Sequence, residues 1–210
     1  MTDPADPIVP SPLDRMRGRR EKPRIHPAEK AVLVLLATHL TILPWALGAM
    51  HPPAQFFSLG CALLAFALAL IPRQYTAEES GSSAFRLVMW PKLLRFPIFW
   101  LGLALLAYVT AQALNPAWTY VQEGKGWWMQ SIAYRAWLPP GVQVPFERGG
   151  PWRMLIIYAS IWLTVCSIWV GFTRRRALQA LFIAIATNGV LLAVFGIAQR
   201  MLGNGKMFGF

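Results

Sequence analysis

Five long stretches of this chain contain no acidic or basic residue and consist almost entirely of apolar side chains. Each is roughly 17 to 23 residues long, about the length that an α-helix needs to cross a hydrocarbon layer of ~30 Å. The apolar runs are continuous rather than alternating, which favours helices over a β-barrel. We therefore predict an all-α fold, a polytopic bundle of five transmembrane helices over residues 31–50, 56–72, 97–114, 154–172 and 177–199.

The remaining sequence divides into a tail and four connections. Residues 1–30 are polar, Pro-rich and basic, a composition that predicts a disordered tail. The transmembrane region covers residues 31–210 and includes one long loop at residues 115–153. His51–Ala54 joins the first two spans and is predicted to be a tight turn, because it contains two consecutive prolines.

Basic residues are distributed unevenly between alternate sides of the predicted membrane. Fourteen of the twenty lie before the first span, between the second and third, or between the fourth and fifth. The positive-inside rule therefore predicts a cytoplasmic N-terminus and places the loop 115–153 outside. The net charge of +11 does not indicate a nucleic-acid partner, because anionic lipid headgroups suit the basic tail better.

The loop 115–153 is rich in aromatic residues, which prefer the headgroup region of a bilayer. We expect Trp127, Trp128 and Trp137 to lie at the outer interface as a partly ordered cap. The segment 131–138 is expected to form a short amphipathic helix that ends at the Pro-Pro-Gly sequence after it.

Small residues recur at helical spacing on two of the predicted spans. Such stripes allow helix backbones to approach closely and hydroxyl groups to hydrogen-bond between helices. We interpret them as packing faces rather than ligand contacts. The stripes are Ser58, Ala62, Ala65 and Ala69 on the second span, and Ser160, Thr164, Ser167 and Gly171 on the fourth.

Polar side chains inside the spans are few. His39 is a functional candidate, because ionisable groups within a membrane are costly, but a structural role bonded to Thr38 or Thr41 is favoured. Asn188 is expected to hydrogen-bond to a neighbouring helix rather than to face a polar cavity. No span contains Asp or Glu, which disfavours a proton- or cation-coupled transporter.

No known catalytic motif is present. The sequence has no phosphate-binding glycine loop, no His/Cys metal cluster and no nucleophile motif of the GxSxG type. We therefore expect neither a metal nor another cofactor.

Two segments carry distinctive residues. The first reads Asn115-Pro116-Ala117-Trp118-Thr119-Tyr120, continues with Trp127-Trp128 and Trp137-Leu138-Pro139, and ends at Pro145-Phe146. The second runs from Thr187-Asn188-Gly189 to Gln199-Arg200 and closes with Gly203-Asn204-Gly205-Lys206. The first resembles the first long outer loop of the bacterial O-antigen ligase and polymerase family. The second is similar to the fifth helix of that family and its exit, so that the resemblance covers most of residues 31–206.

The resemblance implies the N-terminal part of a glycosyltransferase of the bacterial inner membrane. Such enzymes move a glycan from undecaprenyl diphosphate to lipid A–core, in lipopolysaccharide biosynthesis, or to a growing polymer. They use no metal or nucleotide. Family members carry their decisive Arg and His residues mainly in later outer segments, so no catalytic residue is assigned here.

A diphosphate leaving group needs cationic stabilisation, which arginine supplies well. Arg135, Arg153, Arg200 and Lys206 lie on the predicted outer side and are candidate substrate-binding residues, although arginines at helix ends commonly contact the interface alone. The alternative function is a non-enzymatic membrane subunit that anchors or stabilises a larger complex.

Overall fold

The computed structural model describes residues 25–46, 51–75 and 85–201, and the statements below concern these ranges. It contains five helices long and apolar enough to cross a membrane, which confirms the predicted helix bundle and makes the chain a multi-pass membrane protein. Residues 1–24 of the predicted tail and Lys206 lie outside the described ranges. The five helices are α2 (Pro27–Trp45), α3 (Pro52–Leu70), α6 (Pro97–Leu114), α7 (Pro151–Gly171) and α8 (Arg175–Met201).

Prolines begin four of these five helices, and α8, which begins at Arg175, is the exception. α2 begins at Pro27, so the last residues of the predicted tail are helical. The predicted tight turn at His51–Ala54 is wrong, because Pro52 and Pro53 are the first residues of α3. Proline suits this position because an N–H group there would have no partner within the helix, and its fixed φ matches that of the helix.

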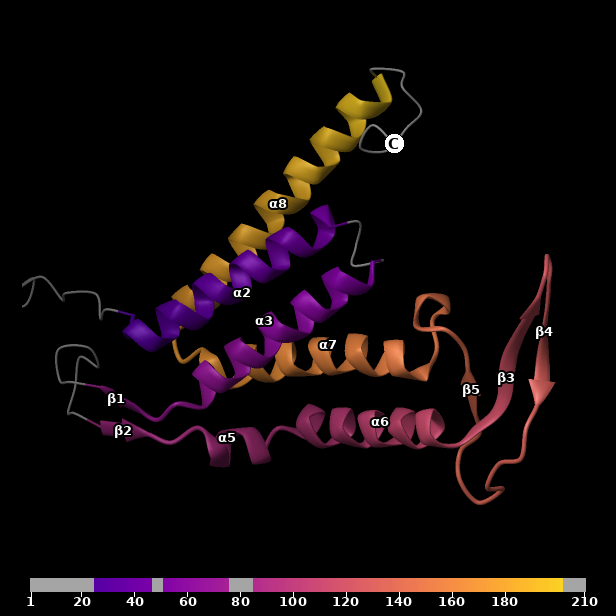
Figure 1. Ribbon diagram of the computed structural model, residues 1–210. Helices are drawn as coiled ribbons and strands as arrows, with labels where there is room; N and C mark the ends of the chain where they lie inside the picture. Colours follow the sequence, from indigo (N-terminus) through magenta and orange to yellow (C-terminus); the bar gives the residue numbers. More distant parts are fainter. Residues whose placement is uncertain (1–24, 47–50, 76–84, 202–210) are drawn as a thin grey trace, which may run out of the picture.

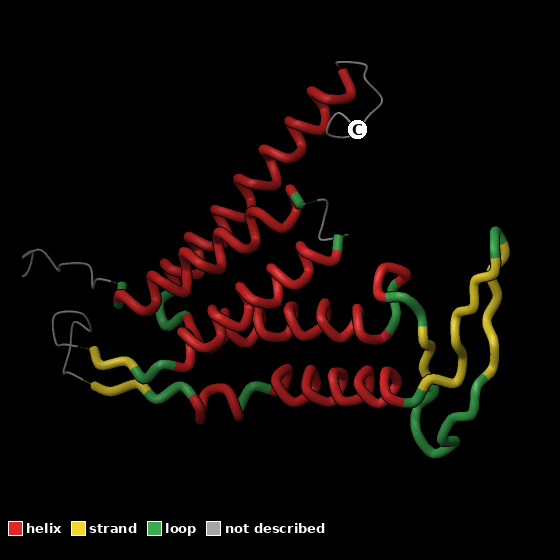
Figure 2. The backbone as a smooth tube through the Cα atoms, in the orientation of Figure 1, coloured by secondary structure: helices red, strands yellow, loops and turns green. Residues whose placement is uncertain are grey.

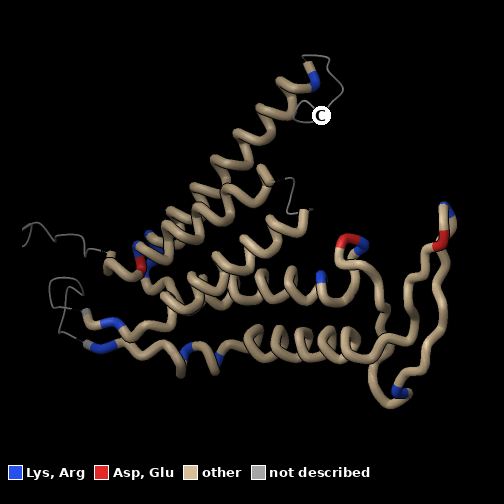
Figure 3. Tube along the Cα trace, viewed as in Figure 1, with Lys and Arg blue, Asp and Glu red and all other residues tan. Residues whose placement is uncertain are grey.

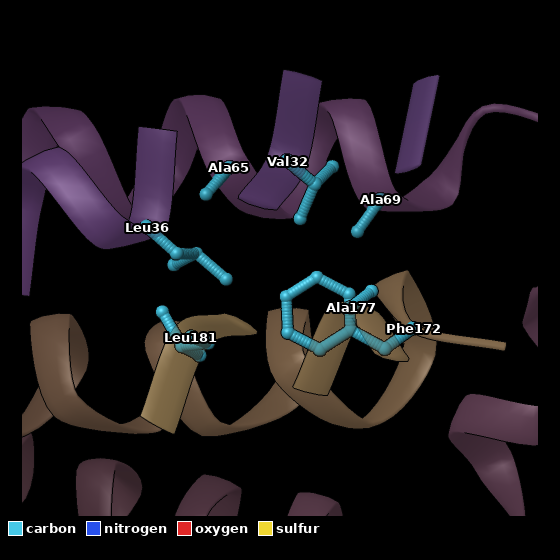
Figure 4. Close-up of a cluster of buried hydrophobic side chains, with 7 residues drawn as sticks. All are labelled: Val32, Leu36, Ala65, Ala69, Phe172, Ala177 and Leu181. Atoms are coloured by element: carbon cyan, nitrogen blue, oxygen red, sulfur yellow. The ribbon is translucent and has the colours of Figure 1, made fainter. Parts of the chain in front are cut away.

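The small-residue stripes form the contact between α3 and its neighbours, as predicted. Every member of both stripes is buried, and α3 packs against α2 and α7. Gly171 shows how closely α7 approaches α2, since a Cβ atom there would lie only 2.9 Å from a methyl carbon of Val32. Figure 4 shows the adjoining core of Val32, Leu36, Ala65, Ala69, Phe172, Ala177 and Leu181.

The bundle has two unlike ends (Figure 1). At the converging end the start of α2, the end of α3, the end of α7 and the start of α8 come together. This end also holds the two-stranded sheet of β1 (Arg73–Tyr75) and β2 (Phe85–Leu87) and the short helix α5 (Trp90–Leu94). Toward the opposite end, here called the sheet end, α8 leans away from α6 and α7.

The sheet end carries a three-stranded sheet, and Figure 2 shows that strands occur only beyond the helix ends. Its order is β4-β3-β5, with β3 antiparallel to β4 and parallel to β5. β4 ends at Ser131 and the residues that follow are not helical, so the predicted amphipathic helix over residues 131–138 is wrong. The strands are β3 (Pro116–Glu123), β4 (Gly126–Ser131) and β5 (Gly141–Gln143), followed by the 3₁₀ turn η2 (Phe146–Arg148).

Local sequence explains the hairpin of β3 and β4. Glu123 pairs with Gly126, which leaves a two-residue turn in which Gly124 has a φ of +58°. This left-handed conformation favours glycine, and the flanking tryptophan, tyrosine, threonine and valine residues favour strands. Of the three tryptophans predicted to form an interfacial cap, Trp127 and Trp128 are therefore strand residues, and Trp137 lies in the loop after β4.

Candidate functional site

A groove at the sheet end has a volume of about 530 Å³. It lies where the end of α6 meets β5, the turn after η2 and the start of α7. Apolar side chains of Leu105, Val109 and Met154 line the part that belongs to the helices. Tyr108 and Tyr158 add phenol groups, and Arg148 is the charged residue of the lining. The groove thus combines an apolar wall with one cation.

Asn115 holds the loop beside this groove in place. Its amide Nδ2 donates to the carbonyl oxygens of Arg135, Leu138 and Pro139 at 3.0, 3.2 and 3.3 Å. Its Oδ1 accepts a hydrogen bond of 2.8 Å from the backbone N–H of Arg135. Asn115 is the C-cap residue of α6 and is buried, so one side chain fastens the loop to the helix end.

Gly141 allows β5 to lie directly against α6. Its backbone N–H donates to the carbonyl oxygen of Asn115 at 3.0 Å. A Cβ atom at this position would lie 1.9 Å from the carbonyl oxygen of Gln112, which no larger residue could tolerate without moving the strand.

Arg148 is a candidate that sequence reasoning missed. Its guanidinium carbon lies 4.4 Å from the ring centre of Tyr120 in β3, and Tyr120 in turn stacks on Trp127 at 6.0 Å. A cation–π contact orients the guanidinium without neutralising its charge. The signal available in the sequence was its position just after Pro145-Phe146, the last element of the first distinctive segment.

The cations predicted from the sequence do not form one cluster. Arg153 lies on the first turn of α7, lines a neighbouring cavity of about 200 Å³ and donates through Nη1 to the carbonyl oxygen of Glu147 at 2.6 Å. Arg135 is exposed on the loop after β4, and Arg200 is exposed on the last turn of α8. The end of α8 stands far from that loop in Figure 1, and Figure 3 shows the charged positions dispersed around the sheet end.

Two intramembrane polar residues bond between helices. His39 Nε2 lies 2.9 Å from Ser58 Oγ on α3, so the expected bond to Thr38 or Thr41 is wrong. Asn188 accepts from Trp45 Nε1 at 2.8 Å and donates to the carbonyl oxygen of Thr41 at 3.2 Å, which confirms the predicted interhelical role.

Three charged residues bond within the converging end, where Glu29 and Arg73 are buried and Lys92 is half-buried. The carboxylate of Glu29 accepts hydrogen bonds from Thr173 N–H at 3.0 Å, Thr173 Oγ at 2.9 Å and Arg174 N–H at 3.0 Å. Arg73 Nη1 donates to the carbonyl oxygen of Gly171 at 2.6 Å, and Lys92 Nζ donates to that of Phe172 at 3.2 Å. Both cations therefore lie at the C-terminal end of α7, where the helix dipole is negative.

Lys92 is electrostatically unusual. Burial lowers the pKa of its ammonium group below the ordinary value, the positive charge of Arg73 lowers the pKa further, and the negative charge of Glu29 opposes both effects. Lys92 Nζ also lies 5.8 Å from the ring centre of Trp169. This lysine is thus held in place by a carbonyl group and a ring.

Protein-family models, curated proteins and solved structures were all compared with this chain, and none matches. Within the described ranges no group of three His, Cys, Asp or Glu residues could hold a metal ion. The assignment of a function therefore depends on the sequence resemblance and on the local chemistry of the sheet end.

Proposed function

We propose that this chain is the N-terminal part of an integral-membrane glycan transferase of the bacterial inner membrane. Its donor would be a glycan linked to undecaprenyl diphosphate, and its acceptor would be lipid A–core or a growing polymer. The observation that carries the proposal is the groove at the sheet end, where apolar walls lie beside Arg148. In this proposal the sheet end is the outer, periplasmic side.

The residues of the resemblance support the proposal by their contacts. The parts of the first distinctive segment that begin at Asn115 and at Trp137 are far apart in sequence, yet the Asn115 side chain bonds to Leu138 and Pro139. The last part of that segment leads directly into η2 and Arg148. A single structural unit at the end of α6 and the start of α7 therefore includes these three of the segment's four parts.

The groove suits the two chemical parts of a prenyl diphosphate. Leu105, Val109 and Met154 offer an apolar surface to a prenyl chain, and a guanidinium group binds phosphate oxygens through paired N–H donors. Arg153, beside the adjoining cavity, offers a second cation to the same headgroup. The proposal assigns these residues to holding the donor and assigns the transfer step to no residue of this chain.

A specific observation favours the alternative, a non-enzymatic membrane subunit. Toward its end α8 leans away from α6 and α7 (Figure 1), and its Val190, Val194 and Ile197 are each more than half exposed. Transmembrane helices of a larger complex would fit against such a face.

Binding of geranylgeranyl diphosphate to the protein in lipid nanodiscs tests the main proposal. Arg148→Ala should weaken binding by roughly tenfold to a hundredfold, since a hydrogen-bonded ionic contact contributes about 1.5–3 kcal/mol. Lys125→Ala, at the exposed hairpin turn, is the matched control and should leave binding unchanged. Diphosphate binding that is insensitive to Arg148 would refute the proposed donor site.

Expression in a ligase-deficient strain tests the second part of the proposal, that the transfer step depends on no residue of this chain. Residues 1–210 alone should not restore glycan-capped lipopolysaccharide, whereas a longer reading frame that includes them should do so. Restored capping by residues 1–210 would show that the catalytic groups lie within this chain. A stable complex with other membrane proteins, without diphosphate binding, would instead support the subunit.

A further inference from the structure

The short helix α5 at the converging end carries two cations on one face. Lys92 and Arg95 belong to the same helical turn, because the backbone N–H of Arg95 donates to the carbonyl oxygen of Pro91 at 3.3 Å. Side chains three residues apart are neighbours on a helix, with Cβ atoms about 5–6 Å from each other. Arg95 is exposed and Lys92 is half-buried, so a ligand can reach both side chains.

Three tryptophans place this pair of cations at the depth of lipid headgroups. Trp90, Trp100 and Trp169 come from α5, the first turn of α6 and the last turn of α7, and each is about half exposed. Exposed indole rings concentrate at the interface between a membrane and water. Because Lys92 Nζ lies 5.8 Å from the ring centre of Trp169, its charge is at the level of this interface.

The ammonium group of Lys92 is already held in position. Its Nζ donates to the carbonyl oxygen of Phe172 at 3.2 Å. An ammonium group has three N–H donors, so two of them are not used by this bond. A side chain that is ordered before binding loses little conformational entropy when a ligand arrives, which favours Lys92 over a flexible surface lysine.

The described residues do not balance the positive charge around Lys92. Glu29 is the one acidic residue among them at this end (Figure 3), and its carboxylate already accepts three hydrogen bonds from Thr173 and Arg174. Arg73 is too deeply buried to contact a ligand, but its charge and burial together lower the pKa of Lys92 despite the opposing charge of Glu29. An anion beside Lys92 would therefore relieve an existing repulsion.

We propose that Lys92 and Arg95 bind the phosphate group of an anionic phospholipid. Both side chains offer N–H donors to phosphate oxygens, and the guanidinium group of Arg95 offers a parallel pair. The exposed ring of Trp169 adds an apolar surface that suits the glycerol and acyl part of a lipid rather than a free phosphate ion. A zwitterionic lipid would bring a further positive charge to this site. The site therefore selects a headgroup with a net negative charge, such as phosphatidylglycerol.

Native mass spectrometry of the purified protein in detergent tests the site. Titration with dioleoyl phosphatidylglycerol measures the dissociation constant of the first bound lipid. Lys92→Gln and Arg95→Gln should each weaken this binding roughly fivefold, the contribution of one basic residue near an anionic membrane surface. Arg95→Lys keeps the charge and should bind nearly as well as the unaltered protein. Arg176→Gln, which removes an exposed cation of α8 at the same end, is the matched control and should leave the binding unchanged.

The titration of Lys92 locates the lipid. The pKa of the ¹³C-methylated lysine should be higher in nanodiscs of phosphatidylglycerol than in nanodiscs of phosphatidylcholine, because a nearby phosphate with no compensating charge favours the ammonium form. Lys30, an exposed lysine at the same end, reports the general surface potential of the bilayer, and its shift should be smaller than that of Lys92.

Arg95→Gln keeps the test valid if Lys92→Gln does not fold, because the Arg95 side chain is exposed. Equal binding of phosphatidylcholine would show that the net charge of the headgroup is not recognised. Displacement of the lipid by millimolar inorganic phosphate would show a site for a free anion instead. Either result, equal shifts at Lys92 and Lys30, or lipid binding insensitive to both glutamine variants would overturn the proposal, which does not rest on glycan transfer.

Discussion

The two ends of this bundle are held together by different chemistry. At the converging end, buried Glu29 binds the connection between α7 and α8, while Arg73 and Lys92 bind the end of α7. At the sheet end, the neutral side chain of Asn115 binds the loop after β4. The converging end is therefore stabilised by hydrogen bonds of buried charged groups, and the loop after β4 at the sheet end by hydrogen bonds of a neutral amide.

This difference corresponds to a difference in shape. At the converging end these hydrogen bonds join elements that are far apart in the sequence, whereas at the sheet end those of Asn115 join a loop to the helix that precedes it. Toward the sheet end, where the groove lies, α8 leans away from α6 and α7 (Figure 1), and the end of α2 stays bonded to it through Trp45 and Asn188. Loss of hydrogen bonds at the converging end should therefore destabilise the whole bundle, whereas loss of those of Asn115 should destabilise the loop alone.

The largest effect is expected for Glu29→Ala. Three donors from Thr173 and Arg174 would lose a buried carboxylate, and hydrogen bonds to charged groups are individually strong. The free energy of unfolding should fall by about 3 kcal/mol in mixed micelles titrated with sodium dodecyl sulfate. Glu123→Ala, at the exposed hairpin turn, serves as the matched control. Equal stability of the two variants would contradict the role given to Glu29.

A smaller and local effect is expected for Asn115→Ala. The variant removes four amide hydrogen bonds to the loop, a loss of about 2 kcal/mol after partial replacement by water. Hydrogen exchange should accelerate in residues 132–143 and stay unchanged in α2 and α3.

Gln130→Ala, on the exposed strand β4, controls for removal of an amide side chain. Uniform acceleration throughout the bundle in Asn115→Ala would show that the sheet end is not an independent unit.

The smallest effect concerns the titration of Lys92. Arg73→Met removes a positive charge that lowers the pKa of Lys92, so this pKa should rise toward the ordinary value. The pKa can be followed by NMR of the ¹³C-methylated lysine. Arg135→Met, on the loop at the opposite end, should leave the Lys92 titration unchanged.

The sign of the associated pH dependence follows from the lowered pKa. The folded protein binds the Lys92 proton less tightly than the unfolded chain does. At neutral pH Lys92 is charged in both states, and its charge then lowers the free energy of unfolding by the full amount. Stability should rise as the pH passes through the folded-state pKa toward 10.5, the ordinary value. Lys92→Gln should remove this alkaline rise, and an unaltered slope would exclude Lys92 as its source.

The spans and the packing faces could be predicted because both are local properties. Hydrophobic length indicates where a helix crosses the membrane, and the spacing of Ser58 and Ser160 with their small neighbours indicates which face packs. Asn188 was predictable for a related reason, since an amide within a span needs a partner on another helix.

The contacts of Glu29, Arg73 and His39 were not predictable from the sequence. Glu29 and Arg73 bond residues 144 and 98 positions away, respectively. Such pairings depend on how the helices rotate and tilt after they associate. The strands of the sheet end were missed for a different reason, because dense aromatic residues suit both an interface and a strand, and the Gly124 turn should have decided between them.

The hydrogen bonds of Glu29 also determine the order of steps in the biogenesis of the protein. Thr173 is made 144 residues after Glu29, so the first helix enters the bilayer long before its carboxylate can reach its partners. Until then the charge must remain in water or among headgroups, because it is too costly in hydrocarbon. The final depth of α2 in the bilayer is consequently reached only when the connection between α7 and α8 has been synthesised. In ribosome-bound chains that end before Thr173, α2 should lie at a shallower depth.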